Sequence, residues 1–376
     1  MESQRARIPP FHVMEVFKKA HARDRLEGDV LHLEVGQPST PAPAPVRDAA
    51  SRALIAERLG YTNALGVDAL RDRIAMHYLD RHGLGVHPSR VAVTVGASGG
   101  MVLALLAAFD AGARIGITAP GYAAYRNIVR ALDLDLIDVR VDESTRYVPT
   151  SGVLDRVDGL DGLIVASPSN PTGTQLTGDE LADLAVWCRR NGVTLLMDEI
   201  YHGISYVGPA PTVLGYHPEA IVLQSFSKYY SMTGWRIGWL VLPKELVPAT
   251  ERLAQNLFIC PPALAQHAAV VAFDATVELD GNVARYAESR TLLGDALDRW
   301  GLPYAPPDGA FYFWVDVSGL GDSRELADRW LDEAGVAVTP GIDFDPTEGH
   351  RFVRLSYSES LEDIAAAIER LDPLIR

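Results

Sequence analysis

Cysteine is scarce in this chain of 376 residues, which has only Cys188 and Cys260. Two thiols cannot form a disulfide framework or a cysteine zinc site, and so few cysteines are typical of a reducing cytoplasm. Long apolar runs are also missing, because the longest spans nine residues, 101–109, whereas a membrane helix needs about 20. The first residues, MESQRARIPPFH, contain no apolar stretch of the kind that a secretory signal requires. We therefore expect a cytoplasmic protein without membrane contact.

Positive charge is in the minority, with 34 Lys and Arg against 49 Asp and Glu, for a formal net charge of −15. This balance argues against nucleic acid and anionic membranes as partners. Lysine is rare even among the basic residues, since only Lys18, Lys19, Lys228 and Lys244 occur. A lysine in an unusual place is therefore easy to notice.

Apolar residues make up 48% of the chain, and their pattern changes along it. Helical patterns at 11–26, 46–58 and 67–81 flank a strand-like run at 31–35. Further strand-like runs, mostly separated by helical patterns, are 91–95, 114–118, 134–139, 163–166, 193–197, 221–223 and 237–242. This alternation predicts an α/β domain with a mostly parallel sheet. A helical pattern from 243 to about 300 leads into a second, looser alternation to the end of the chain, which predicts a smaller α/β domain.

The most informative run is 224–238, QSFSKYYSMTGWRIG. Lys228 follows an apolar strand and two serines, and Arg236 comes eight positions later. A lysine in a loop is usually solvated, but the apolar and aromatic neighbours here predict burial. Burial disfavours the ammonium and yields a nucleophilic amine that can form a Schiff base. Nearby serines and an arginine are suited to a phosphate.

Three other strands are followed by polar or glycine-rich turns. Asp198 ends one strand, the run 167–173 after another contains Asn170, and 95–100 is a glycine-rich turn before a helix. Ligands in open α/β sheets bind beyond the carboxyl ends of strands, and helix N-termini bind phosphate. Taken singly, each feature is more often a helix cap or a tight turn. Together they meet the needs of pyridoxal 5′-phosphate: a lysine, an acid for the ring nitrogen, donors for the phenolate and a phosphate cradle.

With these motifs in this order, nearly the whole chain resembles the class I/II aminotransferases of fold type I, the group that contains aspartate aminotransferase. The run Ser-x-Ser-Lys, five residues, Gly-x-Arg-x-Gly is among the most specific motifs of that family. The resemblance implies a three-layer αβα large domain with a mostly parallel seven-stranded sheet and a smaller α/β C-terminal domain. We place the large domain at 40–285 and the small one at 1–39 together with 286–376.

The resemblance also implies a role for each matching residue toward pyridoxal phosphate. Lys228 would form the Schiff base and move the proton, Asp198 would face the pyridine nitrogen, and Tyr201 would bind the phenolic oxygen. These three are the expected catalytic residues. The other expected cofactor ligands are Asn170 at the phenolic oxygen, Tyr122 stacked on the ring, and Ser225, Arg236 and the backbone of Ala97 and Ser98 at the phosphate.

Substrate and subunit contacts follow from the same resemblance. Arg354 would pair with the substrate α-carboxylate in a bidentate manner, assisted by Asn170 and the Gly36 backbone. Tyr61 would reach the phosphate of a neighbouring subunit, which implies a homodimer with shared sites. The ten histidines show no metal-ligand spacing, so we expect no metal.

The expected activity is transfer of an amino group between an α-amino acid and a 2-oxo acid by a ping-pong mechanism. A β-C–S lyase or another elimination enzyme of the same fold is the alternative, because fold and cofactor do not fix the reaction. An effector-sensing module is a third, disfavoured by the acidic charge. The substrate stays open: Gln37 replaces a glutamate that is common in the family, and the cation that a distal carboxylate would need could be Arg5, Arg7 or Arg126.

Overall fold

A computed structural model describes residues 2–376. Its main feature is a seven-stranded sheet with strand order β2-β8-β7-β6-β5-β3-β4. The strands in that order are β2 (Val91–Thr94), β8 (Gly238–Val241), β7 (Ile221–Ser225), β6 (Thr194–Asp198), β5 (Gly162–Ala166), β3 (Arg114–Ala119) and β4 (Asp135–Arg140). All neighbours pair in parallel except β8, which runs antiparallel to β2 and β7. The predicted seven-stranded, mostly parallel sheet is confirmed.

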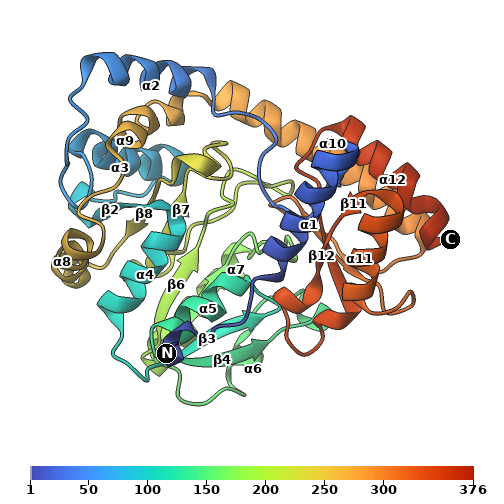
Figure 1. Ribbon diagram of the computed structural model, residues 1–376. Helices are drawn as coiled ribbons and strands as arrows, with labels where there is room; N and C mark the ends of the chain where they lie inside the picture. The colour runs from blue at the N-terminus through green and yellow to red at the C-terminus, as the bar shows by residue number, and fades with distance from the viewer. Residues whose placement is uncertain (1) are drawn as a thin grey trace.

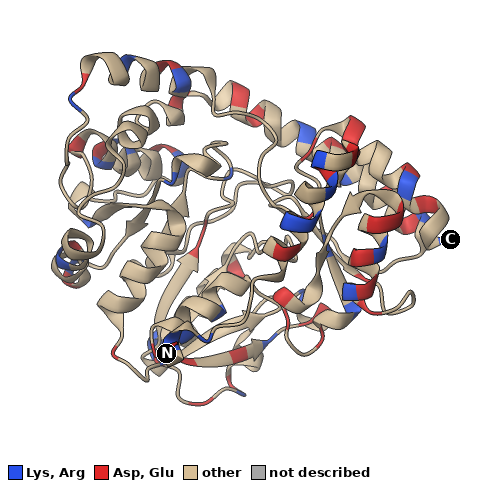
Figure 2. Cartoon of the chain, in the orientation of Figure 1, with Lys and Arg blue, Asp and Glu red and all other residues tan. Residues whose placement is uncertain are grey.

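Both faces of this sheet are buried beneath helices, which produces the three layers (Figure 1). Alternate residues of one strand point to opposite faces, so Leu195 and Met197 of β6 join one apolar cluster and Leu196 joins the other. The first cluster includes residues of α3 (Asp68–His82), α7 (Gly178–Asn191) and α9 (Ala263–Ala269). The second includes residues of α4 (Gly96–Ala108), α5 (Ala123–Ala131) and α8 (Val247–Leu257). Figure 2 shows the central strands almost free of charge, with charged positions gathered on outer helices.

A second, smaller unit is built on a four-stranded antiparallel sheet of order β12-β13-β10-β9. Its strands are β12 (Thr339–Pro340), β13 (Phe352–Ser356), β10 (Tyr312–Asp316) and β9 (Tyr304–Ala305). Near it, β1 (Leu31–His32) pairs in parallel with β11 (Val336–Ala337). The helices of this part are α1 (His12–Glu27), α10 (Thr276–Trp300), α11 (Ser323–Ala334) and α12 (Leu361–Ile375). The remaining helices are α2 (Ala44–Ala56) and the short α6 (Ser151–Leu154).

Local sequence signals set many of the helix ends. Thr177 and Glu180 form a capping box at the start of α7, with Thr177 Oγ1 accepting from the Glu180 N–H, as their spacing predicts. Gly28 and Gly83 end α1 and α3 in the left-handed conformation, at φ +66° and +67°, which glycine adopts without a steric penalty.

Two elements differ from the expectation. The strand expected at 31–35 is only Leu31–His32. Leu33 still donates to the Ala337 carbonyl, but its own carbonyl accepts from Ser356 of β13, and the carbonyl of Glu34 accepts from side chains, including Thr339 Oγ1 at 2.8 Å. The helical pattern expected from 243 to 300 divides into α8, α9 and α10. Pro261 and Pro262 lie in the first break, and proline cannot donate the backbone hydrogen bond that a continuous helix needs.

The helix α10 is continuous through the expected boundary at 285 (Figure 1). It contacts α12 of the smaller unit, while Glu278 in its first turn accepts from the backbone N–H of Ala44 in α2. One helix thus contacts elements of both units, and the division at 39/40 and 285/286 stays a prediction. No helix within residues 2–376 has the length and apolar character to cross a membrane.

Candidate active site

A cavity of about 240 Å³ opens where β5, β6 and β7 end. The three strands are parallel and in register, so Ala166 lies opposite Asp198, and Asp198 opposite Leu223. The turns that follow them therefore meet at one edge of the sheet. All the residues predicted for the site, apart from Tyr61, line this cavity: Gly36, Ala97, Ser98, Tyr122, Asn170, Asp198, Tyr201, Ser225, Lys228, Arg236 and Arg354.

Tyr61 lies elsewhere. It is 84% exposed and lines a separate groove beside Cys260 and His267. The predicted contact with a neighbouring subunit would require such exposure, and it stays a prediction.

Lys228 is partly buried at the cavity wall. Its Nζ donates to the Gly36 carbonyl at 2.5 Å and lies 5.8 Å from the ring centre of Tyr201. Loss of solvent and the positive charge of Arg354 lower the pKa of Lys228 to about 8, against an opposing effect of Asp198. The side chain is therefore an amine that loses its proton close to neutral pH, as a nucleophile or a base requires.

Asp198 ends β6 with 3% of its surface exposed. Its Oδ1 accepts from the backbone N–H of Ile200 at 3.1 Å, and its Oδ2 accepts from the hydroxyl of Tyr125 on α5. Burial raises the pKa of Asp198 to about 7, whereas the Ile200 N–H and the charge of Lys228 lower it. Because burial disfavours the ionised form of this carboxyl, a cationic partner would stabilise that form strongly.

A group of hydrogen-bond donors gathers where α4 begins. The turn after β2 brings the N-terminal backbone of α4, at Ala97 and Ser98, toward Ser225, Ser227 and Arg236. The Oγ atoms of Ser225 and Ser227 lie 2.9 Å apart. Free N–H groups at a helix N-terminus together with an arginine form a favourable anion site.

Gly96 allows the turn between β2 and α4 to approach Arg236 closely. Its φ is +65°, and a Cβ at this position would lie 2.5 Å from Arg236 Nη2. Glycine adopts this backbone conformation without strain, and any larger residue would require the Arg236 guanidinium to move.

Arg354 enters the cavity from β13 of the smaller unit and is 4% exposed. Its Nη1 donates to Asn170 Oδ1 at 3.1 Å, and its Nη2 donates to the carbonyl of Glu34 and to Thr339 Oγ1. The buried Nε has no partner within the described residues. An unpaired buried donor is costly, so this guanidinium is well placed to donate hydrogen bonds to an anion.

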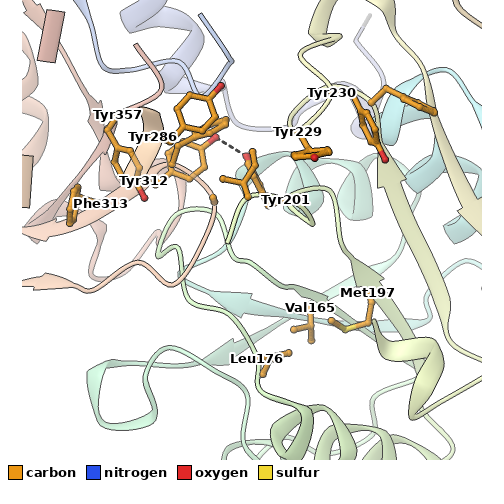
Figure 3. Close-up of a cluster of buried hydrophobic side chains, with 14 of the residues drawn as sticks. Val165, Leu176, Met197, Tyr201, Tyr229, Tyr230, Tyr286, Tyr312, Phe313 and Tyr357 are labelled. Atoms are coloured by element: carbon orange, nitrogen blue, oxygen red, sulfur yellow. Dashed lines mark hydrogen bonds between the residues drawn. The ribbon is translucent and has the colours of Figure 1, made fainter. Parts of the chain in front are cut away.

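An aromatic wall completes the cavity between the two units. The hydroxyl oxygens of Tyr201 and Tyr312 lie 2.7 Å apart, and Figure 3 shows the two side chains meeting from different elements. The Arg354 guanidinium packs on the ring of Tyr312, 4.4 Å from its centre. Tyr201 and Arg354 are thus linked through one aromatic side chain.

Sequence reasoning misses two of these residues. Tyr125 and Tyr312 come from a helix and a strand without a polar motif, whereas Ser227 is one of the two serines expected near a phosphate. Only the spacing Tyr122-x-x-Tyr125 could have indicated Tyr125, since Tyr122 precedes α5 and the centres of the two rings lie 5.2 Å apart. No local signal indicates Tyr312, because its partners Tyr201 and Arg354 are distant in sequence.

Arg5 and Arg126, two of the three candidate cations for a distal carboxylate, are held elsewhere. Arg5 pairs with Asp133, and the buried Arg126 pairs with Asp138 at 2.6 Å. Arg7, the third, is exposed and does not line the cavity. Among the described residues, the cations that line the cavity are Lys228, Arg236 and Arg354.

Comparison with known proteins agrees with this geometry. The model of the family "Aminotransferase class I and II" matches residues 28–371. The valine–pyruvate aminotransferase of Mycobacterium tuberculosis is 48% identical over 98% of this chain and 96% of its own length. The aspartate/prephenate aminotransferase of Thermus thermophilus is 32% identical over 96% and 95%.

Solved structures give the same result. The crystal structure of an aminotransferase from M. tuberculosis matches with a TM-score of 0.98 at 47% identity, covering 100% of this chain and 99% of that one. Aspartate aminotransferase from T. thermophilus with maleate matches with a TM-score of 0.94 at 30% identity and the same coverage. The chain belongs to the class I and II aminotransferase family, and it is an aminotransferase.

Proposed function

We propose that this aminotransferase binds pyridoxal 5′-phosphate in the cavity, with Lys228 as its covalent attachment point. The observation that carries the proposal is the position of Lys228, a partly buried amine between a buried carboxyl and an anion site. The residues present fit the cofactor: the α4 N-terminus with Ser225, Ser227 and Arg236 suits its phosphate, and Asp198 suits its ring nitrogen. The family to which the chain belongs generally uses this cofactor.

When bound, the cofactor supplies a cationic ring that stabilises negative charge at the substrate α-carbon. Asp198 would hold the proton on the ring nitrogen through its carboxylate. Asn170 and Tyr201 would donate hydrogen bonds to the phenolic oxygen, and Tyr122 would pack against the ring. Lys228 Nζ would take the proton from the α-carbon of the amino acid and deliver it to the C4′ carbon of the cofactor, and the second half-reaction would move a proton in the opposite direction.

Arg354 is the proposed ligand of the substrate α-carboxylate, together with Asn170 and the backbone of Gly36. The unpaired Nε of Arg354 supports this role, since a carboxylate would occupy it beside the other guanidinium nitrogens. Fixing the carboxylate also fixes the direction of the α C–H bond, and such orientation can lower a barrier by several kcal/mol.

The proposed amino donor has a small apolar side chain, with valine as donor and pyruvate as acceptor in a ping-pong sequence. The apolar side chains of Phe11, Val13, Met14 and Ile128 also line the cavity, and they suit a small apolar substrate side chain. Asp343 holds this segment in place by accepting from the N–H groups of His12 and Val13 at 2.9 and 2.6 Å. Each cation among the described residues that line the cavity already has a proposed role, so none of them is left for a second substrate carboxylate.

We also propose a homodimer in which Tyr61 reaches the phosphate of the partner's cofactor. Leu54 and Ile55 on α2 and Val277 on α10 expose 61%, 89% and 90% of their surface. These exposed apolar side chains on α2 and α10 are available for an interface between subunits.

Both cysteines are free, which supports the expected cytoplasmic location.

The test is a transamination assay with purified protein supplied with cofactor, L-valine and pyruvate. We expect valine with pyruvate to be a better pair than aspartate with 2-oxoglutarate, and Lys228→Ala to lose about a thousandfold or more in kcat. Lys244→Ala, an exposed lysine, should stay fully active. A preference for aspartate would overturn the apolar substrate, and ammonia release without an acceptor would favour the elimination reaction.

The dimer has a separate test. Lys228→Ala and Tyr61→Ala proteins should each be weakly active, and a mixture that exchanges subunits should regain activity. In the mixed dimer, one site combines an intact Lys228 with an intact Tyr61. Absence of any recovery, or a monomer by light scattering, would contradict the shared site.

A further inference from the structure

A second cavity, of about 230 Å³, lies beside the active site and is lined by residues of α1, of the segment 30–37 and of the start of α12. Val35 and Gln37 line both cavities. The second cavity contains three carboxylates, Glu34, Glu359 and Asp363, and the two imidazoles of His21 and His32. No lysine or arginine is among the described residues that line it, so its charge favours a cation.

Glu34 is the unusual residue of this cavity. Its side chain is fully buried, and its Oε1 lies 2.9 Å from His32 Nδ1. Its Oε2 is also buried and has no hydrogen-bond partner within the described residues. A buried carboxylate oxygen without a partner is strongly disfavoured, and a bound cation would satisfy it.

His21 is oriented as a metal ligand would be. Its Nδ1 lies 3.1 Å from the backbone carbonyl of Phe17. Because a carbonyl only accepts, Nδ1 carries the proton and the lone pair is on Nε2. Histidine ligands of metals commonly donate their other N–H to a carbonyl or carboxylate in this way.

The three side chains converge. His21, His32 and Glu34 each offer one ligand atom, and these atoms lie within 4.8 Å of one another. The ring centres of the two histidines are 5.1 Å apart. Ligands of a tetrahedral zinc ion with bonds of about 2.0–2.1 Å are about 3.4 Å apart, a separation that small side-chain rotations would reach because His21 is exposed.

We propose that His21, His32 and Glu34 bind a divalent transition-metal ion of the Zn²⁺ class, with Glu359 and Asp363 adding negative charge around it. Two imidazole nitrogens and one carboxylate oxygen suit Zn²⁺, whereas Mg²⁺ and Ca²⁺ favour oxygen ligands alone. The spacing of the histidines in the sequence does not indicate this site. His21 lies on α1 and His32 on β1, and the third ligand, Glu34, is not a histidine.

The position of the site connects it with substrate binding. The carbonyl of Glu34 accepts from Arg354 Nη2 and from Thr339 Oγ1. A metal on the Glu34 carboxylate therefore fixes the residue whose backbone supports Arg354, and it joins α1 to the segment that contains Gly36. The metal is a positioning element, separate from the residues that contact the reacting atoms.

The test uses untagged holoenzyme treated with a chelator and then titrated with Zn²⁺ alone in a calorimeter. We expect one Zn²⁺ per chain with micromolar or tighter affinity. His21→Ala should weaken binding at least about tenfold. The matched control is His350→Ala, since His350 is likewise exposed and its Nδ1 lies 3.1 Å from the Thr347 carbonyl. This control should bind as the native protein does.

Thermal unfolding gives a second readout. Zn²⁺ should raise the unfolding temperature of the native and His350→Ala proteins but not of His21→Ala, because a ligand that binds only the folded state stabilises it. His21→Ala leaves no buried group unpaired, so its folding is not at risk. Equal affinity of native and His21→Ala protein, or no binding tighter than millimolar, would overturn the proposal.

Discussion

Tyr201 and Tyr312 share a hydrogen bond of 2.7 Å between their hydroxyl oxygens, although 111 residues separate them. Tyr201 follows β6 of the large sheet, and Tyr312 begins β10 of the smaller one. Burial raises the pKa of both phenols, so they remain neutral donors and acceptors. The pair joins the proposed cofactor site on one sheet to the arginine that approaches from the other.

Removing the two hydroxyl groups should have unequal effects. Tyr201→Phe should lower kcat about tenfold or more, because its hydroxyl is the proposed donor to the cofactor and such a bond is worth about 1.4 kcal/mol or more. Tyr312→Phe keeps the ring beneath Arg354 and should cost less than about threefold in kcat. Steady-state kinetics of both variants decide this, and equal losses would contradict the role of Tyr201.

Asp198→Asn should abolish most of the activity while leaving the fold intact. The amide keeps the shape of the carboxyl but cannot be anionic, so the proton on the ring nitrogen loses its partner. We expect a fall in kcat of about a hundredfold or more, the size of effect that follows the loss of a buried charge pair. Glu199→Gln is the matched control, since Glu199 is equally buried but does not line the cavity.

Arg354→Lys should raise the KM for the amino acid at least about tenfold with a smaller change in kcat. A lysine provides one point charge and cannot form the parallel hydrogen bonds of a guanidinium. Arg351→Lys on the same segment is the control. Arg351 pairs with Asp316 and Glu348, away from the cavity, and its substitution should leave KM unchanged. Similar KM values for all three proteins would remove Arg354 from the carboxylate site.

Gly96→Ala should weaken binding of the cofactor. The added methyl group would press on Arg236 and displace it from the anion site. Gly83→Ala introduces the same backbone strain, at φ +67°, with no atom within 4 Å of the new Cβ. The control should lose about 1 kcal/mol of stability and no cofactor affinity. Equilibrium dialysis measures both affinities, and an unaffected Gly96→Ala protein would argue against a cradle at this turn.

Glu199 should make the protein less stable as the pH rises. Burial raises the pKa of Glu199 from 4.5 to about 8, against hydrogen bonds from Val213 and Thr212 that lower it. Between these values the folded chain holds a proton that the unfolded chain has released. The stability that the protonated Glu199 contributes is therefore fully present below about pH 4.5. It is lost as the pH rises through 8, at about 1.4 kcal/mol per pH unit.

Glu199→Gln should reduce this dependence, because an amide does not titrate. The unfolding temperature of the native protein should fall more between pH 5 and pH 8 than that of the variant. Parallel curves for the two proteins would show that Glu199 is ionised in the folded state across this range.

Most of the fold and the polar core of the site could be predicted because their signals are local. Asp198 ends one strand, and Asn170 and Lys228 lie in polar turns that follow two others, so the alternation of strands and helices by itself predicts that they meet at one edge of the sheet. Arg354 needed the family resemblance, since nothing in its own segment indicates which distant residues it meets. The role of Tyr61 likewise rests on the family resemblance, because it involves a second chain.

Residues that depend on the packing of two units could not be predicted. The hydroxyl of Tyr312, at the start of β10, meets Tyr201 in the turn that follows β6, and no periodicity in the sequence encodes that contact. The buried carboxylate of Glu34 is similar. Its strand-like surroundings predict a residue paired within a sheet. In the structure β1 ends before Glu34, and the carbonyl of Glu34 accepts from Arg354 instead.

The antiparallel course of β8 has a consequence for the motif around Lys228. Ser225 at the end of β7 lies directly opposite Gly238 at the start of β8. The residues between them therefore form a loop whose two ends are paired with each other in the sheet. The distance from Lys228 to Arg236 is then set inside this closed loop and is insensitive to shifts of the surrounding helices. Adding or deleting one residue there would change that span while the sheet stayed intact. The length of the loop is thus as much a part of the site as the side chains that it presents.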